Sequence, residues 1–113
     1  MSKYGARKEV VDGYTFDSRK EARRYVSLKM LQMAGEITAL KAHPVYLLQD
    51  AFNYRGRRIR KIEYVADFQY IEDGQIIIED VKGDKSIITA LAKVKIKMFK
   101  YKYPELVFRI VEE

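Results

Sequence analysis

Two β-rich runs, residues 64–72 and 75–82, carry the clearest pattern of hydrophobic and polar positions in the chain. They flank Asp73-Gly74, and an Asp-Gly pair between β-rich runs predicts a tight hairpin, because a type I′ turn needs positive φ at both central residues. The second run contains Ile76-Ile77-Ile78, which is apolar on both faces of a strand. We therefore expect this strand to lie inside a sheet that helices cover.

The register of this hairpin brings two acidic residues together. If the turn has two residues, Glu72 faces Gln75 and, counting outward, Asp67 lies directly opposite Asp80 at a non-hydrogen-bonded pair. Cβ atoms at such a pair are ~4.5–5.5 Å apart, so the carboxylates repel each other unless a divalent cation lies between them. Lys82 emerges on the same face as Asp80. Two acids and a lysine at one place are typical of metal-assisted phosphodiester hydrolysis; the alternative is a pair of surface acids neutralised by nearby cations.

The N-terminal third predicts a hairpin and a helix. Asp12-Gly13 lies between short apolar runs and predicts another tight turn. Ser18 and Glu21 then form a capping box at the start of a helix that ends before Gly35. Glu21 also begins an otherwise apolar stripe at i, i+4 and i+7 spacing, so its carboxylate can either cap the helix or face inward toward the sheet.

The remaining pattern predicts a strand around residues 45–48, a helix from a Ser86 cap to about Tyr101, and a last strand over residues 106–111. A helix between the 75–82 strand and the last strand permits a parallel, right-handed crossover. This order predicts an α/β or α+β fold, with a mixed central sheet flanked by two main helices.

Composition narrows the chemistry. The 113 residues fit a single domain over residues 1–113. The chain has no cysteine and a single histidine, His43, which excludes thiolate sites and multi-histidine metal sites. No run approaches the ~18 apolar residues of a membrane helix and no signal peptide is visible, so we expect a cytoplasmic protein. A net charge of +6 favours a polyanionic partner, though only mildly.

Basic residues gather in two places. Residues 53–61 form a basic loop. It is either a solvated hairpin tip or a loop that binds phosphates beside the acidic site, and we favour the second interpretation. Its cations are Arg55, Arg57, Arg58, Arg60 and Lys61. On the second helix, Lys93 belongs to a row that is ordinarily solvated but could meet a nucleic-acid backbone. Lys95 falls between two apolar stripes, so it either extends along them to solvent or reaches the active site.

Asp67 followed by Asp80-Val81-Lys82 on the next strand resembles the PD-(D/E)XK nuclease superfamily, which includes restriction endonucleases. The fuller set of motifs is similar to a small phage-associated, endonuclease-like group within it. The motifs are Val11–Tyr25, Tyr64-Val-Ala-Asp67, Glu79-Asp-Val-Lys-Gly83 and Lys97–Pro104. Ala66 stands where the motif's proline would be, a departure that is common in this superfamily.

The resemblance implies a restriction-endonuclease-like core and a role for each motif residue. Asp67 and Asp80 would coordinate Mg²⁺ or Mn²⁺, and the Val81 carbonyl and Glu21 would complete the ligand set. Lys82 would orient the attacking water or stabilise charge on the phosphate.

These roles predict a metal-dependent DNA endonuclease of phage or prophage type, acting in recombination, repair or genome processing in the host cytoplasm. Cutting both strands needs two sites, which favours a homodimer. The alternatives are a nucleic-acid-binding module that keeps the fold without cleaving, and an interaction protein that uses its basic faces on acidic partners.

Overall fold

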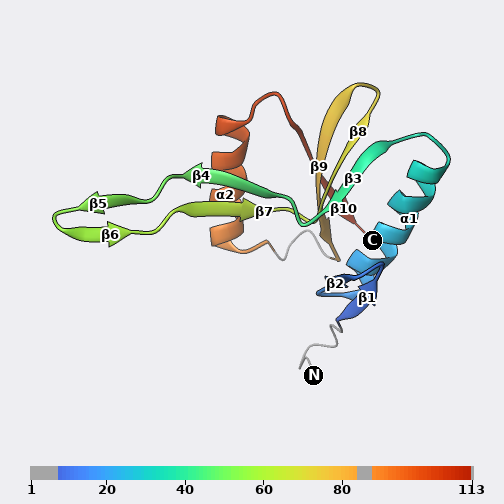
Figure 1. Cartoon of the computed structure of the whole chain (residues 1–113), viewed down its shortest axis with the longest axis horizontal. Helices are drawn as coiled ribbons and strands as arrows, with labels where there is room; N and C mark the ends of the chain where they lie inside the picture. Colours follow the sequence, from blue (N-terminus) through green and yellow to red (C-terminus); the bar gives the residue numbers. More distant parts are fainter. Residues whose placement is uncertain (1–7, 84–87, 113) are drawn as a thin grey trace.

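The computed structural model describes residues 8–83 and 88–112. It consists of a body, built from a sheet and two helices, and a long thin arm that leaves the body on one side (Figure 1). The elements in chain order are β1 (Glu9–Val11), β2 (Tyr14–Phe16), α1 (Arg19–Met33), β3 (Thr38–Ala42), β4 (Val45–Gln49), β5 (Phe52–Tyr54), β6 (Arg57–Ile59), β7 (Ile62–Val65), β8 (Phe68–Glu72), β9 (Gln75–Lys82), α2 (Ala90–Lys102) and β10 (Val107–Glu112). No helix of this described part is long and apolar enough to cross a membrane.

The central sheet has the strand order β10-β9-β8-β3. β9 pairs parallel with β10 and antiparallel with β8, so the sheet is mixed and β9 lies inside it. The parallel pair is joined through α2, because a parallel connection needs a crossover that returns the chain to the same end of the sheet. The structure therefore confirms the predicted α+β architecture with a mixed sheet and two helices.

The turns form as their sequences predict. Glu72 pairs with Gln75, and the turn between them has φ of 51° at Asp73 and 76° at Gly74, as a type I′ turn requires. The Asp-Gly pair at residues 12–13 has the same signs of φ and joins β1 to β2. Turn chemistry is local, which is why both registers were predictable.

Both ends of α1 are capped through hydrogen bonds that its sequence encodes. The Ser18 hydroxyl oxygen accepts from the Glu21 amide at 3.2 Å. At the other end, Gly35 has a φ of 81° and the Glu36 amide donates to the Leu31 carbonyl at 3.0 Å, the pattern of a Schellman motif. The helix therefore starts and stops where the sequence predicts.

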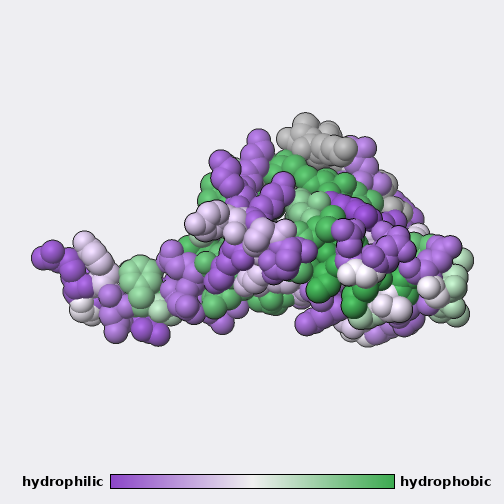
Figure 2. Space-filling view, turned by 90° about the horizontal axis from the view of Figure 1, so that it is seen from above, coloured by the Kyte–Doolittle hydropathy of each residue, from purple (hydrophilic) through white to green (hydrophobic). Residues whose placement is uncertain are grey.

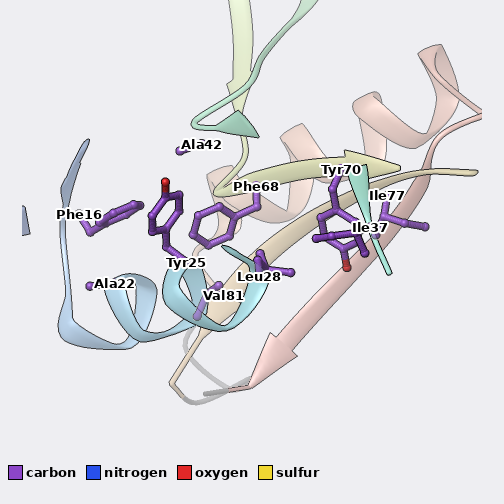
Figure 3. Close-up of a cluster of buried hydrophobic side chains, with 10 residues drawn as sticks. All are labelled: Phe16, Ala22, Tyr25, Leu28, Ile37, Ala42, Phe68, Tyr70, Ile77 and Val81. Carbon is purple, nitrogen blue, oxygen red and sulfur yellow. The ribbon is translucent and has the colours of Figure 1, made fainter. Parts of the chain in front are cut away.

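Two apolar clusters cover the two faces of the sheet. Neighbouring residues of β9 divide between them: Ile77 packs under α1, and Ile78 packs under α2. Figure 3 shows the first cluster, in which Tyr25 and Leu28 of α1 lie over Phe68. The second cluster consists of Leu48, Tyr64, Ala66, Ile78, Ile96 and Phe99. Each fully buried large side chain contributes roughly 1.5–3 kcal/mol, so these two layers fix both helices on the sheet.

Three details of the prediction are wrong. The structure has a separate strand at Thr38–Ala42, a segment for which the sequence analysis predicted no strand. The second helix begins at Ala90 with Thr89 as its cap, while the predicted cap, Ser86, lies outside the described residues. The apolar stripe that includes Leu91 is largely exposed, because the sheet supplies a partner only for the neighbouring stripe.

The arm is a β-ribbon made of two successive strand pairs. β4 pairs with β7 at its base, where α2 packs on both strands, and β5 pairs with β6 beyond it. The predicted basic loop is therefore a hairpin, with φ of 48° at Arg55 and 82° at Gly56. Figure 1 shows β5 and β6 leading away from the sheet, and in Figure 2 they form a narrow, mostly hydrophilic extension. This arm accounts for a longest dimension of 53 Å against a shortest of 28 Å.

Candidate active site

An open cavity of about 330 Å³ lies where β7, the bend that follows it, β9, α1 and the start of α2 meet. The structure brings five of the predicted site residues to its wall: Glu21 from α1, Asp67 from the segment before β8, Asp80 and Lys82 from β9, and Lys95 from α2. Residues 46 positions apart in the sequence, from Glu21 to Asp67, thus share one hollow. The five carry three negative and two positive charges.

Asp67 reaches the cavity by a route that the hairpin register did not predict. The regular ladder ends at Phe68 opposite Glu79, and Asp67 lies in a bend between β7 and β8. Its amide donates to the Glu79 carbonyl at 3.0 Å, and its Oδ2 accepts from the Val81 amide at 2.6 Å. The predicted direct pairing with Asp80 is therefore wrong, because the Asp67 carboxylate occupies the position of a backbone acceptor. The two acids nevertheless line the same cavity.

The environment of Asp67 disfavours its charge. Burial is the main reason that the pKa of this carboxyl rises from 3.8 to about 7, and the negative charges of Glu21 and Asp80 raise it further. The hydrogen bond from the Val81 amide and the charge of Lys82 act in the opposite direction, but they do not compensate. A further positive charge in the cavity would return Asp67 to its ionised form.

Of the two positions that the sequence left open for the Glu21 carboxylate, the structure shows the inward one, because this carboxylate lines the cavity. The cap of the helix comes from Ser18, whose hydroxyl oxygen accepts from the Glu21 amide. Burial raises the pKa of Glu21, and Asp17 and Asp80 add to the rise; a hydrogen bond from the Asp17 backbone and the charge of Lys82 oppose it. The charge of Glu21 in turn raises the pKa of Asp67, as expected for carboxyl groups that share a small volume.

Lys82 lies between the acids. Its Nζ is 3.9 Å from Asp80 Oδ2, at the outer limit for an ion pair, and its side chain is partly exposed. Asp80 itself is almost fully buried. Lys82 is therefore close enough to respond to the charge in the cavity without forming a tight pair with Asp80.

The neighbouring acid of β9, Glu79, is neutralised on the other face of the sheet. Arg24 Nε donates to Glu79 Oε1 at 2.9 Å and Nη2 to Oε2 at 2.6 Å, and the Tyr70 hydroxyl also donates to Oε2. This bidentate pair gives Glu79 a structural role. It also means that Arg24 is bound on the face of the sheet opposite Asp80.

Tyr64 of β7 is a cavity residue to which the sequence gave no role of its own. Its hydroxyl is buried beside the Asp80 carboxylate, although within the described residues it makes no hydrogen bond of ordinary geometry. Burial raises its pKa well above the usual range, and the nearby charge of Asp80 is the next largest cause. The only sign in the sequence that Tyr64 belongs to the site is its position three residues before Asp67. The motif that contains both residues is recognised by its acidic residues, so the tyrosine was given no role.

The start of α2 was also missed, because the helix was predicted to begin earlier. Thr89, Leu91 and Ala92 line the cavity, and the Thr89 hydroxyl oxygen accepts from the Ala92 amide at 3.1 Å. The first turn of α2 contains no acidic residue. The positive end of the helix therefore faces the acidic side chains across the cavity.

The other predicted nucleic-acid contacts lie elsewhere. Arg55, Arg57 and Arg58 are exposed on the arm, and none of them lines the cavity. Figure 1 shows this hairpin far from α1 and β9, which carry the acids of the site. Lys93 is exposed on α2 and lines a separate hollow. The expectation of a basic loop beside the acidic site is thus wrong in its placement, because the strands of the arm continue outward instead of folding back.

A family model described as "Protein of unknown function (DUF1064)" matches residues 1–112. The chain belongs to this family. No curated protein and no solved structure matches it. The chemistry of this DUF1064 chain is therefore argued from the cavity itself.

The donors at the cavity fit a hard divalent cation better than any other metal. Residues 8–83 and 88–112 contain no group of three or more His, Asp or Glu side chains already close enough to hold a metal ion. Mg²⁺ commonly uses one or two carboxylates and keeps water or substrate oxygens as its other ligands. Asp67 and Asp80 supply two carboxylates. The Val81 amide points toward Asp67, and in an extended strand the carbonyl of the same residue faces the same edge.

Proposed function

We propose that this protein is a metal-dependent DNA endonuclease of phage or prophage type, which hydrolyses phosphodiester bonds in the cytoplasm with Mg²⁺ or Mn²⁺. The observation that carries the proposal is the convergence of Glu21, Asp67, Asp80 and Lys82 on one open cavity. The resemblance of these residues to the PD-(D/E)XK motif supports the same assignment.

The electrostatics support a cation as the missing partner. Asp67 has a pKa of about 7 because burial and two neighbouring acids disfavour its charge. A divalent cation bound by Asp67 and Asp80 would neutralise phosphate charge and make a bound water a better nucleophile. The donors are all oxygen atoms, which Mg²⁺ and Mn²⁺ prefer.

The other side chains have roles that follow from their positions. Glu21 lies across the cavity from β9 and would hold a water by hydrogen bonding. Lys82 would stabilise negative charge that develops on the phosphoryl oxygens, since its ammonium is beside Asp80 but not tightly paired. Lys95, which α2 brings to the cavity, would bind an adjacent phosphate of the same strand.

A nicking assay tests the proposal. Supercoiled plasmid is incubated with the wild type in Mg²⁺, in Mn²⁺ and in EDTA, together with Asp80→Asn, Lys82→Ala and the exposed control Glu105→Gln. We expect metal-dependent nicking by the wild type and by the control, and a loss of at least 100-fold in both site variants. Metal-dependent nicking by Asp80→Asn at the wild-type rate would remove the site assignment.

A second candidate function is a nucleic-acid-binding module without hydrolytic activity. The specific observation in its favour is the exposed basic arm, which needs no catalysis to hold DNA. DNA binding by a wild-type protein that fails to nick plasmid, flap and four-way substrates in either metal would favour this second function.

A further inference from the structure

The outer half of the arm is strongly basic and almost wholly exposed. Between Ala51 and Ile62 there are five Arg or Lys residues and no acidic residue. All three residues of β5 are exposed, and β6 adds two exposed arginines. A hairpin this small has no core of its own, so its composition is not explained by burial.

The two faces of the hairpin differ in chemistry. Residues paired across an antiparallel ribbon share a face, and faces alternate along each strand. Asn53 pairs with Arg58, and the Arg58 Nη1 donates to Asn53 Oδ1 at 3.5 Å. Arg60 is exposed just beyond the end of β6. This face, the polar face, therefore consists of amide and guanidinium groups.

The opposite face is mainly apolar. Phe52 pairs with Ile59, and Tyr54 pairs with Arg57. The aromatic rings are 42% and 59% exposed, respectively. Arg57 is the one cation within the strands of this face, and it differs from its neighbour Arg58 chiefly in the direction that its side chain takes.

We propose that the outer arm is a DNA-reading ribbon that enters the major groove of a duplex with its polar face toward the base edges. The major groove, about 12 Å wide, admits a two-stranded β-ribbon. Arg and Asn are the side chains that pair best with guanine and adenine edges there. The flanking Arg55 and Arg60 would contact phosphates on either side. The inference rests on the proposed function for its choice of DNA as partner, and it adds where and how the duplex is held.

In this geometry, DNA recognition by the arm and phosphodiester hydrolysis at the cavity take place at two separate parts of the protein. The ribbon lies away from α1 and β9, which carry acids of the cavity (Figure 1), so a duplex held by the arm would be contacted at a second place by the cavity residues. Each cation that contacts a phosphate should add about 0.9 to the slope of log K against log salt. For an arginine that contacts base edges, the binding affinity should also depend on the chemical groups exposed in the major groove.

The test compares Arg58→Ala with Arg57→Ala, which remove the same charge from adjacent positions on opposite faces. Binding of a short labelled duplex is measured by fluorescence anisotropy in EDTA, so that cleavage plays no part. A second duplex of the same sequence carries glucosylated 5-hydroxymethylcytosine, which fills the major groove and leaves the phosphates unchanged. The corresponding single strand is the third probe, and circular dichroism checks that each variant is folded.

We expect the wild type to bind the plain duplex at least ten-fold more tightly than the glucosylated one. Arg58→Ala should weaken binding to the plain duplex about ten-fold and lose most of this preference, whereas Arg57→Ala should keep it. Equal effects of the two substitutions, no discrimination by the wild type, or tighter binding of the single strand would each overturn the inference. Because these readouts need no metal, a failed nicking assay with preserved groove discrimination would refute the nuclease alone.

Discussion

Removing the charge of Asp67 should stabilise the metal-free protein above neutral pH. The pKa of this carboxyl is 3.8 in an unfolded chain and about 7 in the fold, so the folded state binds the proton more tightly. Stability from this group is therefore fully present below pH 3.8 and is lost as pH rises to about 7. Asp67→Asn removes the titration, and the asparagine oxygen can still accept the hydrogen bond from the Val81 amide.

The size of the effect follows from the interval between the two pKa values. At about 1.4 kcal/mol per unit, the full interval corresponds to about 4 kcal/mol, of which about 2–3 kcal/mol falls between pH 5 and pH 8. Asp67 is not fully buried, so solvent screening reduces the loss, and we expect about 2 kcal/mol over that range. Glu21, Asp80 and Lys82 face the same cavity and shift this value, but they remain in both proteins.

Urea unfolding in EDTA at pH 5 and pH 8 measures this difference, with Asp50→Asn as an exposed control. Asp67→Asn should be the more stable protein at pH 8, and its advantage should shrink at pH 5. Millimolar Mg²⁺ at pH 8 should stabilise the wild type by mass action and leave the variant unchanged. Parallel pH profiles for the two proteins, or a variant less stable than the wild type at pH 8, would refute the reasoning.

Two further substitutions test the surroundings of the site. Arg24→Met should lower the free energy of unfolding in urea by about 3–5 kcal/mol, because it leaves Glu79 buried without its cation. The control, Arg23→Met, changes an exposed neighbour and should have little effect. Similar losses in the two variants would contradict the role of the buried pair. Tyr64→Phe should leave the free energy of unfolding unchanged or raise it, since the buried hydroxyl makes no hydrogen bond of ordinary geometry. The same substitution should weaken Mn²⁺ binding about ten-fold in calorimetry, because the hydroxyl lies beside the Asp80 carboxylate and would orient it toward the metal. Unchanged Mn²⁺ affinity would exclude that role.

The parts of the fold that sequence predicted are those fixed by local chemistry. The Asp-Gly turns need positive φ, and only a few residue types adopt it without strain, so the hairpin register followed directly. Ser18 and Gly35 similarly fixed the ends of α1. The alternation of a strand also put Lys82 on the same side as Asp80, without any knowledge of the rest of the sheet.

The parts that sequence did not predict depend on contacts between distant segments. α2 has two apolar stripes of similar quality, and only the sheet beneath it decides that Phe99 is buried while Leu91 is exposed. Asp67 leaves the ladder because its carboxylate bonds to the Val81 amide, which no pattern in either strand specifies. The base of the arm forms because β4 pairs with β7, although β5 and β6 lie between them in the sequence. The turn at the tip of the arm does not determine this pairing.

The strongest argument for a cation site is the contrast between two adjacent acids on one strand. Glu79 is fully buried and receives a bidentate arginine and a tyrosine hydroxyl, which is how a fold stabilises a permanent internal charge. Asp80, the next residue, is also buried, yet its ion pair with Lys82 is a long one. Asp67 shares that cavity with a carboxyl pKa raised toward neutrality. A fold that neutralises one acid so completely, and leaves its neighbours facing an open cavity, has the charge distribution that a divalent cation and a phosphate would complete.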